Sequence, residues 1–144
     1  MTQKEISNAR KDIWNSIYTA VDMSYYIGEG LTLYKGLPEE DGIDRFKKDK
    51  YKMSINDNIN REITAEAQVL EKLKLYIHDK TARTIILDHF NAACNRNFRM
   101  GLIYDTVLIY DDMDDATEYN ELDESYNYNM RELHKEIEGA LNNE

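Results

Sequence analysis

Apolar residues recur at intervals of three and four along most of the chain, which is the spacing of one face of an α-helix. The first such segment covers residues 5–27 and includes Ile6 and Ile13. Gly28 and Gly30 follow it, and glycine is common just after the last turn of a helix. The spacing therefore predicts a first helix that ends near residue 27.

Residues 31–53 break this periodicity. Gly36, Pro38 and Gly42 lie here, together with several charged side chains. Glycine and proline interrupt helices and favour turns. We expect an irregular connection with at most one short helix.

A second helix is predicted from an N-cap at Ser54 to residues 78–80. Its expected buried stripe consists of Ile55, Ile59, Ile63, Ala67, Leu70 and either Leu73 or Lys74, extended by Ile77. A third helix is expected to start at a Thr81 cap. Its extension through residues 101–110 is ambiguous, because Val107 and Ile109 also suit a strand. We expect this part to be helical, since no second strand is available to pair with it.

The last periodic segment covers residues 114–141. The prediction is therefore an all-α fold: one domain over residues 1–144, formed by an antiparallel bundle of about four main helices with the irregular 31–53 connection. The single proline and six glycines agree with few, long helices. Trp14 is expected to anchor the core.

The charge is strongly acidic and unevenly distributed. The net charge is −10, and no lysine or arginine lies between Met100 and Met130. Tyrosines, which are common at binding surfaces, lie within the same acidic stretch. The candidate partner-binding residues are Asp105, Tyr110, Asp111, Asp112, Asp114, Asp115, Glu118, Tyr119, Glu121, Asp123 and Glu124. Such a surface creates a negative field that attracts cationic partners, although a run of charge can also serve solubility alone.

Familiar catalytic and metal-binding patterns are absent from the sequence. The residues three before His78, His89 and His134 are not glutamates, so the Glu-x-x-His pattern of ferritin-like sites fails. An EF-hand loop starting at Asp111 would lack its glycine and its final glutamate. We therefore expect no metal site, no cofactor and no enzymatic activity.

Two further residues have structural rather than catalytic explanations. The single cysteine, Cys94, is expected to be a buried structural residue, and His89 to be a partly buried core histidine. The short positive cluster at Lys47, Lys48, Lys50 and Lys52 is interrupted by acids. Direct nucleic-acid binding is not expected, because a chain this acidic repels phosphate.

These observations predict a non-enzymatic protein that binds and inhibits a basic, nucleic-acid-binding partner. In size and charge the chain resembles the small acidic inhibitors of phages and mobile elements, including anti-CRISPR proteins and DNA mimics, although no shared motif carries the resemblance. The alternative is a structural or regulatory protein that dimerises or docks on another protein, with the acid serving only solubility. No apolar run approaches the length of a membrane span and no signal peptide is evident, so we expect a cytoplasmic protein of a bacterial host cell without membrane contact.

Overall fold

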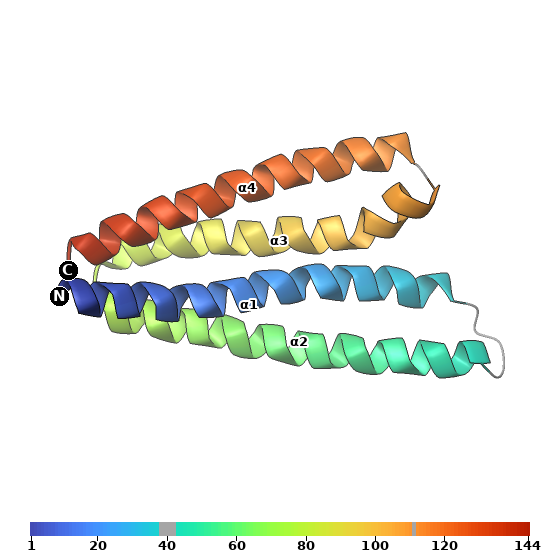
Figure 1. Cartoon of the computed structure of the whole chain (residues 1–144), viewed down its shortest axis with the longest axis horizontal. Helices are drawn as coiled ribbons and strands as arrows, with labels where there is room; N and C mark the ends of the chain where they lie inside the picture. The colour runs from blue at the N-terminus through green and yellow to red at the C-terminus, as the bar shows by residue number, and fades with distance from the viewer. Residues whose placement is uncertain (38–42, 111) are drawn as a thin grey trace.

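The computed structural model contains four long helices joined by short connections (Figure 1). They are α1 (Gln3–Gly36), α2 (Ile43–Tyr76), α3 (Lys80–Tyr110) and α4 (Met113–Asn142). The structure describes residues 1–37, 43–110 and 112–144, and all side chains in these ranges except those of 43, 44, 105, 106 and 108–110. The predicted all-α bundle of four helices is confirmed, and residues 101–110 are helical.

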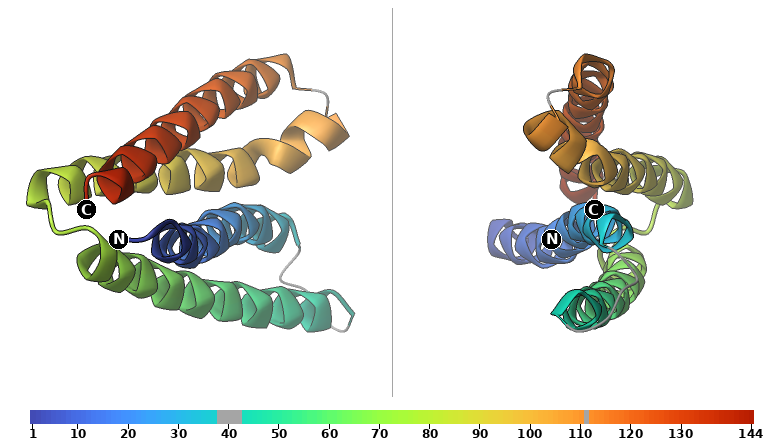
Figure 2. Two further views of the ribbon diagram at one scale, coloured as in Figure 1. Left: turned by 60° about the vertical axis from the view of Figure 1, so that its left-hand side comes forward. Right: turned by 90° about the vertical axis from the view of Figure 1, so that its right-hand side faces the viewer.

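The helices lie side by side in the order α2, α1, α3, α4 (Figures 1 and 2). Helix α1 packs against both α2 and α3, whereas α4 packs mainly against α3 and touches α1 much less. Helices α1 and α2 run antiparallel, and so do α3 and α4, but α1 and α3 run in the same direction. The bundle is therefore two helical hairpins joined along the α1–α3 contact.

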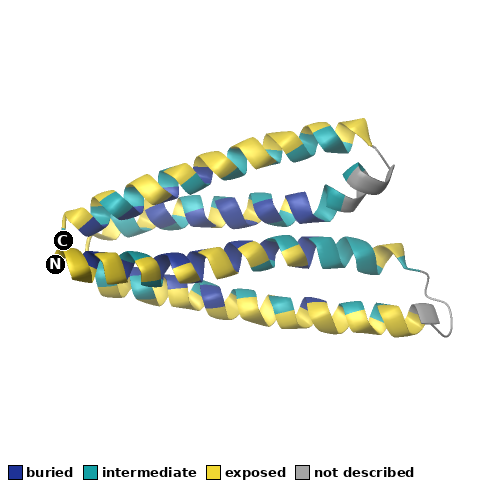
Figure 3. Ribbon diagram, viewed as in Figure 1, coloured by how far each residue is buried: buried dark blue, intermediate teal, exposed yellow. Residues whose placement is uncertain are grey.

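Buried residues concentrate on the facing sides of α1 and α3 (Figure 3). On α1, Ile13, Ile17 and Val21 are completely buried, as the spacing of the first segment predicts. Trp14 is 8% exposed, so its expected place in the core is confirmed. Near the termini, Leu133 and Ile137 of α4 complete the same apolar cluster.

The predicted end of the first helix at residue 27 is wrong, because α1 continues to Gly36. Gly28 lies inside the helix, against the backbone of α3 around Gly101. A Cβ on Gly28 would lie 2.9 Å from the amide nitrogen of Leu102. This glycine therefore permits close helix packing and does not end the helix.

The predicted irregular connection over residues 31–53 is wrong for most of its length. Residues 31–36 extend α1, and α2 begins at Ile43. Gly36 is the last residue of α1, and the backbone amide of Leu37 donates to the carbonyl oxygen of Tyr34. Pro38 and Gly42 lie outside the described residues.

The predicted buried stripe of α2 is also wrong for several positions. Ile63 and Leu70 are 59% and 46% exposed, and Ala67 is exposed as well. Ile55, Leu73 and Ile77 are buried as predicted, and the other buried apolar positions are Ala65 and Val69. A stripe that advances by four residues drifts around a helix of 3.6 residues per turn. Exposure accordingly rises from Ile55 through Ile59 to Ile63.

The helix caps differ from those predicted. Ser54 lies inside α2 and caps nothing. The carboxylate of Asp79 accepts hydrogen bonds from the amides of Thr81 (2.9 Å) and Ala82 (3.4 Å), so it performs the role expected of Thr81. Asp112 caps α4 in the same manner.

Both chain termini lie at one end of the bundle (Figure 1). The N-terminal ammonium donates to the carbonyl oxygen of Glu144 at 3.2 Å, and the amide of His78 donates to the Glu144 carboxylate at 2.7 Å. Arg10 of α1 pairs with Glu138 of α4 nearby. The end of α1 and the start of α4 lie at the opposite end of the bundle (Figure 1).

Candidate functional site

The acidic segment predicted from the sequence lies at the end of the bundle opposite the termini, around the start of α4 (Figure 1). We call its described carboxylates the acidic tip: Asp112, Asp114, Asp115, Glu118 and Glu121. Asp111 and the side chains of Asp105 and Tyr110 lie outside the described residues. The candidate surface is therefore carried by the first turns of α4.

The helix brings only part of the predicted set together. Asp114, Glu118 and Glu121 are spaced by four and three residues, so they share one side of α4, with roughly 5–6 Å between successive Cβ atoms. Asp123 follows Glu121 by two residues and therefore points to the opposite side of the helix. Glu124 follows Glu121 by three residues and extends the row, and both Asp123 and Glu124 are exposed.

The acidic residues at the start of α4 have local structural roles. The Asp112 carboxylate accepts hydrogen bonds from the amides of Asp114 (3.0 Å) and Asp115 (3.1 Å). Negative charge in the first turn is also favoured by the helix dipole. Part of this acidic run is therefore explained by the start of α4.

Helix α3 supplies cations that the sequence window lacks. Arg99 Nη2 lies 2.7 Å from Glu118 Oε1, and Arg96 Nε donates to Ser125 Oγ at 3.1 Å. Both arginines line a hollow of about 340 Å³ with Glu118 and Glu121. Glu118 is therefore already neutralised, whereas Asp114 and Glu121 are exposed and join no ion pair among the described residues.

Tyr119 belongs to an internal aromatic cluster and is only half exposed. Its ring lies 6.1 Å from that of Tyr104, which in turn lies 5.9 Å from Tyr25 of α1. Burial, and then the hydrogen bond with Tyr119, raise the pKa of Tyr25 far above its ordinary value. Tyr119 therefore holds α4 against its neighbours and offers little free surface to a partner.

A second polar cluster lies inside the bundle, and the sequence reading missed it. Glu62 and Glu66 of α2 and Cys94 of α3 place their ligand atoms within 4.8 Å of one another. Ser24 of α1 donates to Glu62 Oε1 at 2.7 Å. The four-residue spacing of Glu62 and Glu66 was the available signal for this cluster. It was missed because the predicted apolar stripe placed the buried face of α2 at the wrong residues.

Burial disfavours the charged forms of Glu66 and Cys94 in this cluster. Burial raises the pKa of the Cys94 thiol to about 12, and a protonated thiol is a poor nucleophile. Burial, followed by the charge of Glu62, raises the pKa of Glu66. Neither glutamate forms an ion pair within the described part of the chain. Two carboxylates and a thiol are a donor set able to hold a divalent metal ion such as zinc.

The raised pKa of Glu66 predicts a pH-dependent effect on stability. A folded-state pKa above the unfolded one means that the stability linked to this group is complete at low pH and is lost as pH rises through the folded value. Glu66→Gln, which does not ionise, should therefore raise Tm at pH 7 by roughly 2 to 4 °C. The advantage should disappear near pH 4, and thermal melts across this range measure it.

Glu71→Gln is the matched control, because Glu71 is exposed on the same helix. Its melting temperature should follow that of the wild type at every pH. If both variants gained the same stability, the gain would come from the lower net charge of the chain and not from the burial of Glu66.

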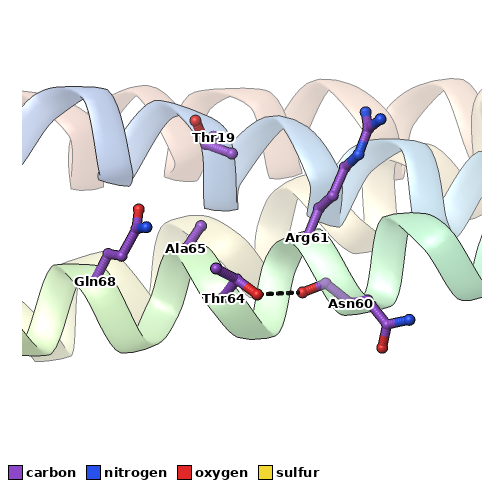
Figure 4. Close-up of a pocket in the computed structure, with 6 residues that line it drawn as sticks. All are labelled: Thr19, Asn60, Arg61, Thr64, Ala65 and Gln68. Atoms are coloured by element: carbon purple, nitrogen blue, oxygen red, sulfur yellow. Dashed lines mark hydrogen bonds between the residues drawn. The ribbon is translucent and has the colours of Figure 1, made fainter.

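A further hollow, of about 320 Å³, lies between α1 and α2 (Figure 4). Thr19 of α1 and five residues of α2 line it: Asn60, Arg61, Thr64, Ala65 and Gln68. Thr64 Oγ1 donates to the carbonyl oxygen of Asn60 at 2.9 Å, an ordinary contact within a helix. This lining contains one cation and no acid–base pair.

His89 lies between α3 and α4, partly buried as expected. Its Nδ1 lies 3.1 Å from Asn129 Oδ1, and its ring contacts Tyr128 edge to face. Cys94 is buried, also as expected. These contacts tie α3 to α4.

Within the described residues, none of the helices has the length and apolar character that crossing a bilayer requires. Comparison of the chain with family models, curated proteins and solved structures finds no match. The function must therefore be argued from the chain's own residues.

Proposed function

We propose that this chain is a non-enzymatic interaction protein that binds a basic partner through the acidic tip. The observation that supports the proposal most is the exposure of Asp114 and Glu121 on one side of α4 with no ion-pair partner among the described residues. A basic surface that normally contacts nucleic-acid phosphates would satisfy these carboxylates. Occupation of that surface would inhibit the partner, as DNA mimics from phages and mobile elements do.

The ion pair between Arg99 and Glu118 narrows the proposed surface. It leaves Glu118 unavailable to a partner, but it also holds α4 against α3. The remaining carboxylates are held on a rigid helix, which limits the entropy that a partner must remove on binding. The proposed contact is therefore smaller than the full acidic segment and better ordered.

Charge reversal at the tip tests this proposal. The double variant Asp114→Lys, Glu121→Lys should reduce binding to the phosphocellulose-binding proteins of a bacterial lysate by at least about tenfold, because close interfacial charge pairs contribute more than 1 kcal/mol each. Capture at low salt by the immobilised chain, followed by quantitative mass spectrometry, measures the loss. Added duplex DNA should release the same proteins from the wild type.

The matched control is Asp57→Lys, Glu71→Lys, which makes the same change in net charge on exposed positions of α2. It should retain wild-type capture. An equal loss of captured protein in both variants would mean that net charge alone causes the effect. Capture that added duplex DNA does not reduce would exclude DNA mimicry.

The alternative function, a structural or regulatory protein that docks through its helices, is favoured by one observation. Ile59, Ile63 and Leu70 form an exposed apolar row on α2. An apolar row of this kind is suited to a helical partner. Under this alternative, the charge reversal at the acidic tip would leave binding unchanged.

A further inference from the structure

The end of the bundle opposite the termini carries a second charged surface. We call it the basic tip, and it consists of Arg45, Lys47, Lys48, Lys50 and Lys52 in the first turns of α2. Asp49 is the one acid among residues 45–53. The basic tip on the α1–α2 hairpin and the acidic tip on the α3–α4 hairpin therefore lie at the same end of the molecule (Figure 1).

Each tip also exposes large apolar side chains. Met113 is 72% exposed, Phe46 69% and Met53 68%, and these are the most exposed large hydrophobic residues in the described part of the chain. Phe46 and Met53 are seven residues apart, so they share one side of α2 within the basic tip. An apolar centre with a charged rim is the usual composition of a protein–protein interface.

The basic tip is held in place by α1. Lys48 Nζ lies 4.8 Å from the centre of the Tyr34 ring and donates to the carbonyl oxygen of Leu37 at 3.4 Å. Lys47 and Lys50 remain exposed and line a hollow of about 500 Å³ between the start of α2 and Leu37. The tip therefore presents cations on an ordered surface.

We propose that the chain self-associates, with the basic tip of one copy bound to the acidic tip of a second copy. Because both tips lie at the same end, a single twofold axis repeats the contact, so that each tip of one copy meets the opposite tip of the other. Met113 of one copy then faces Phe46 and Met53 of its partner. This inference rests on the acidic tip of the proposed function and identifies the basic tip of a second copy as one surface that the acidic tip binds.

Net repulsion between two copies of charge −10 opposes this contact. Repulsion between distant charges is screened beyond about 10 Å at 0.1 M salt, whereas charges in direct contact are screened less. The tips should therefore associate most strongly at moderate salt. Association should weaken both at very low salt, where repulsion reaches further, and near 1 M.

Sedimentation velocity of the full chain tests self-association at about 0.1 M and about 1 M salt. At about 0.1 M salt we expect a species of twice the 17.0 kDa chain mass. Its dissociation constant should rise at least fivefold when the salt is raised to about 1 M. Lys47→Glu, Lys50→Glu should be monomeric, and so should Asp114→Lys, Glu121→Lys. The control Lys74→Glu, Lys80→Glu carries the same charge change at exposed positions away from the tips and should dimerise like the wild type.

A mixture of the two tip variants provides the decisive measurement. The first pair of exchanges leaves the basic tip without net positive charge, and the second leaves the acidic tip with most of its negative charge cancelled, so neither variant keeps the full attraction between opposite tips. In the mixture, the unchanged acidic tip of one variant meets the unchanged basic tip of the other, and the introduced glutamates meet the introduced lysines. Mixed in equal amounts, they should form a heterodimer although each alone is monomeric. Circular dichroism of each variant establishes that it is folded.

A wild type that stays monomeric at high concentration, or a mixture that stays monomeric, overturns the inference. The lysate experiment separates this outcome from the proposed function. Salt-sensitive, DNA-competed capture by a strictly monomeric chain would retain the proposed function and exclude only the second copy as partner. Dimerisation without such capture would support the contact between two copies and contradict the proposed function.

Discussion

Gly101→Ala is expected to lower the stability of the fold by about 3 kcal/mol, the upper end of the usual range for overpacking, and Tm by roughly 10 °C. A Cβ at this position would lie 2.9 Å from the amide nitrogen of Glu29 and even closer to the carbonyl oxygen of Tyr25. Both are backbone atoms of α1, which no rotamer change can move aside. Helices α1 and α3 would have to separate, and the core beside them would lose contacts.

Gly139→Ala is the matched control for this prediction. Gly139 lies inside α4, and a Cβ there would meet nothing within 4 Å. Alanine has a higher helix propensity than glycine, so this variant should gain up to about 1 kcal/mol. Thermal and urea unfolding of the two variants should therefore shift in opposite directions. A shift of both in the same direction would contradict the close packing of α1 and α3.

Leu73→Ala is expected to cost about 2 to 5 kcal/mol, because it removes a fully buried side chain and leaves a cavity. Leu73 is 1% exposed and belongs to the central apolar cluster. The same deletion at Leu75, two residues along α2, provides the control because Leu75 is 62% exposed. Leu75→Ala should change the free energy of unfolding by less than about 0.5 kcal/mol, as for most surface substitutions.

This pair of variants also tests the orientation of α2. Urea denaturation with a common slope would place the two midpoints far apart. Comparable losses at both positions would mean that Leu75 is covered in solution, for example by a partner on the exposed side of α2. The exposed row at Ile59, Ile63 and Leu70 would then be the surface to examine next.

Local spacing was sufficient to predict the number and type of the helices. The periodicity of α1 around Ile13 and Ile17 reflects a helix that is covered by neighbours on two sides, so the apolar signal is strong. It was not sufficient for Gly28, whose role depends on a helix more than 70 residues away in sequence. The sequence pattern alone does not distinguish a glycine that ends a helix from a glycine that allows a neighbouring helix to pack closely.

The same limitation explains the errors on α2. Its buried face includes Glu62 and Glu66, which a search for apolar stripes discards, while the more hydrophobic Ile63 lies exposed. The acidic tip shows the converse effect. A window without lysine or arginine appears uncompensated, yet Arg99 reaches Glu118 from the preceding helix. Charge pairing of this kind depends on the fold and cannot be read from neighbouring residues.

The serial order of the helices has a consequence for how the molecule opens. Helix α2 is attached mainly to α1, and α4 mainly to α3, whereas α1 and α3 are each covered on two sides. Detachment of an outer helix exposes one interface, but separation of the central pair exposes the whole core. Amide protons of α1 and α3 should therefore exchange only through global unfolding, while those of the outer helices are also released by partial opening.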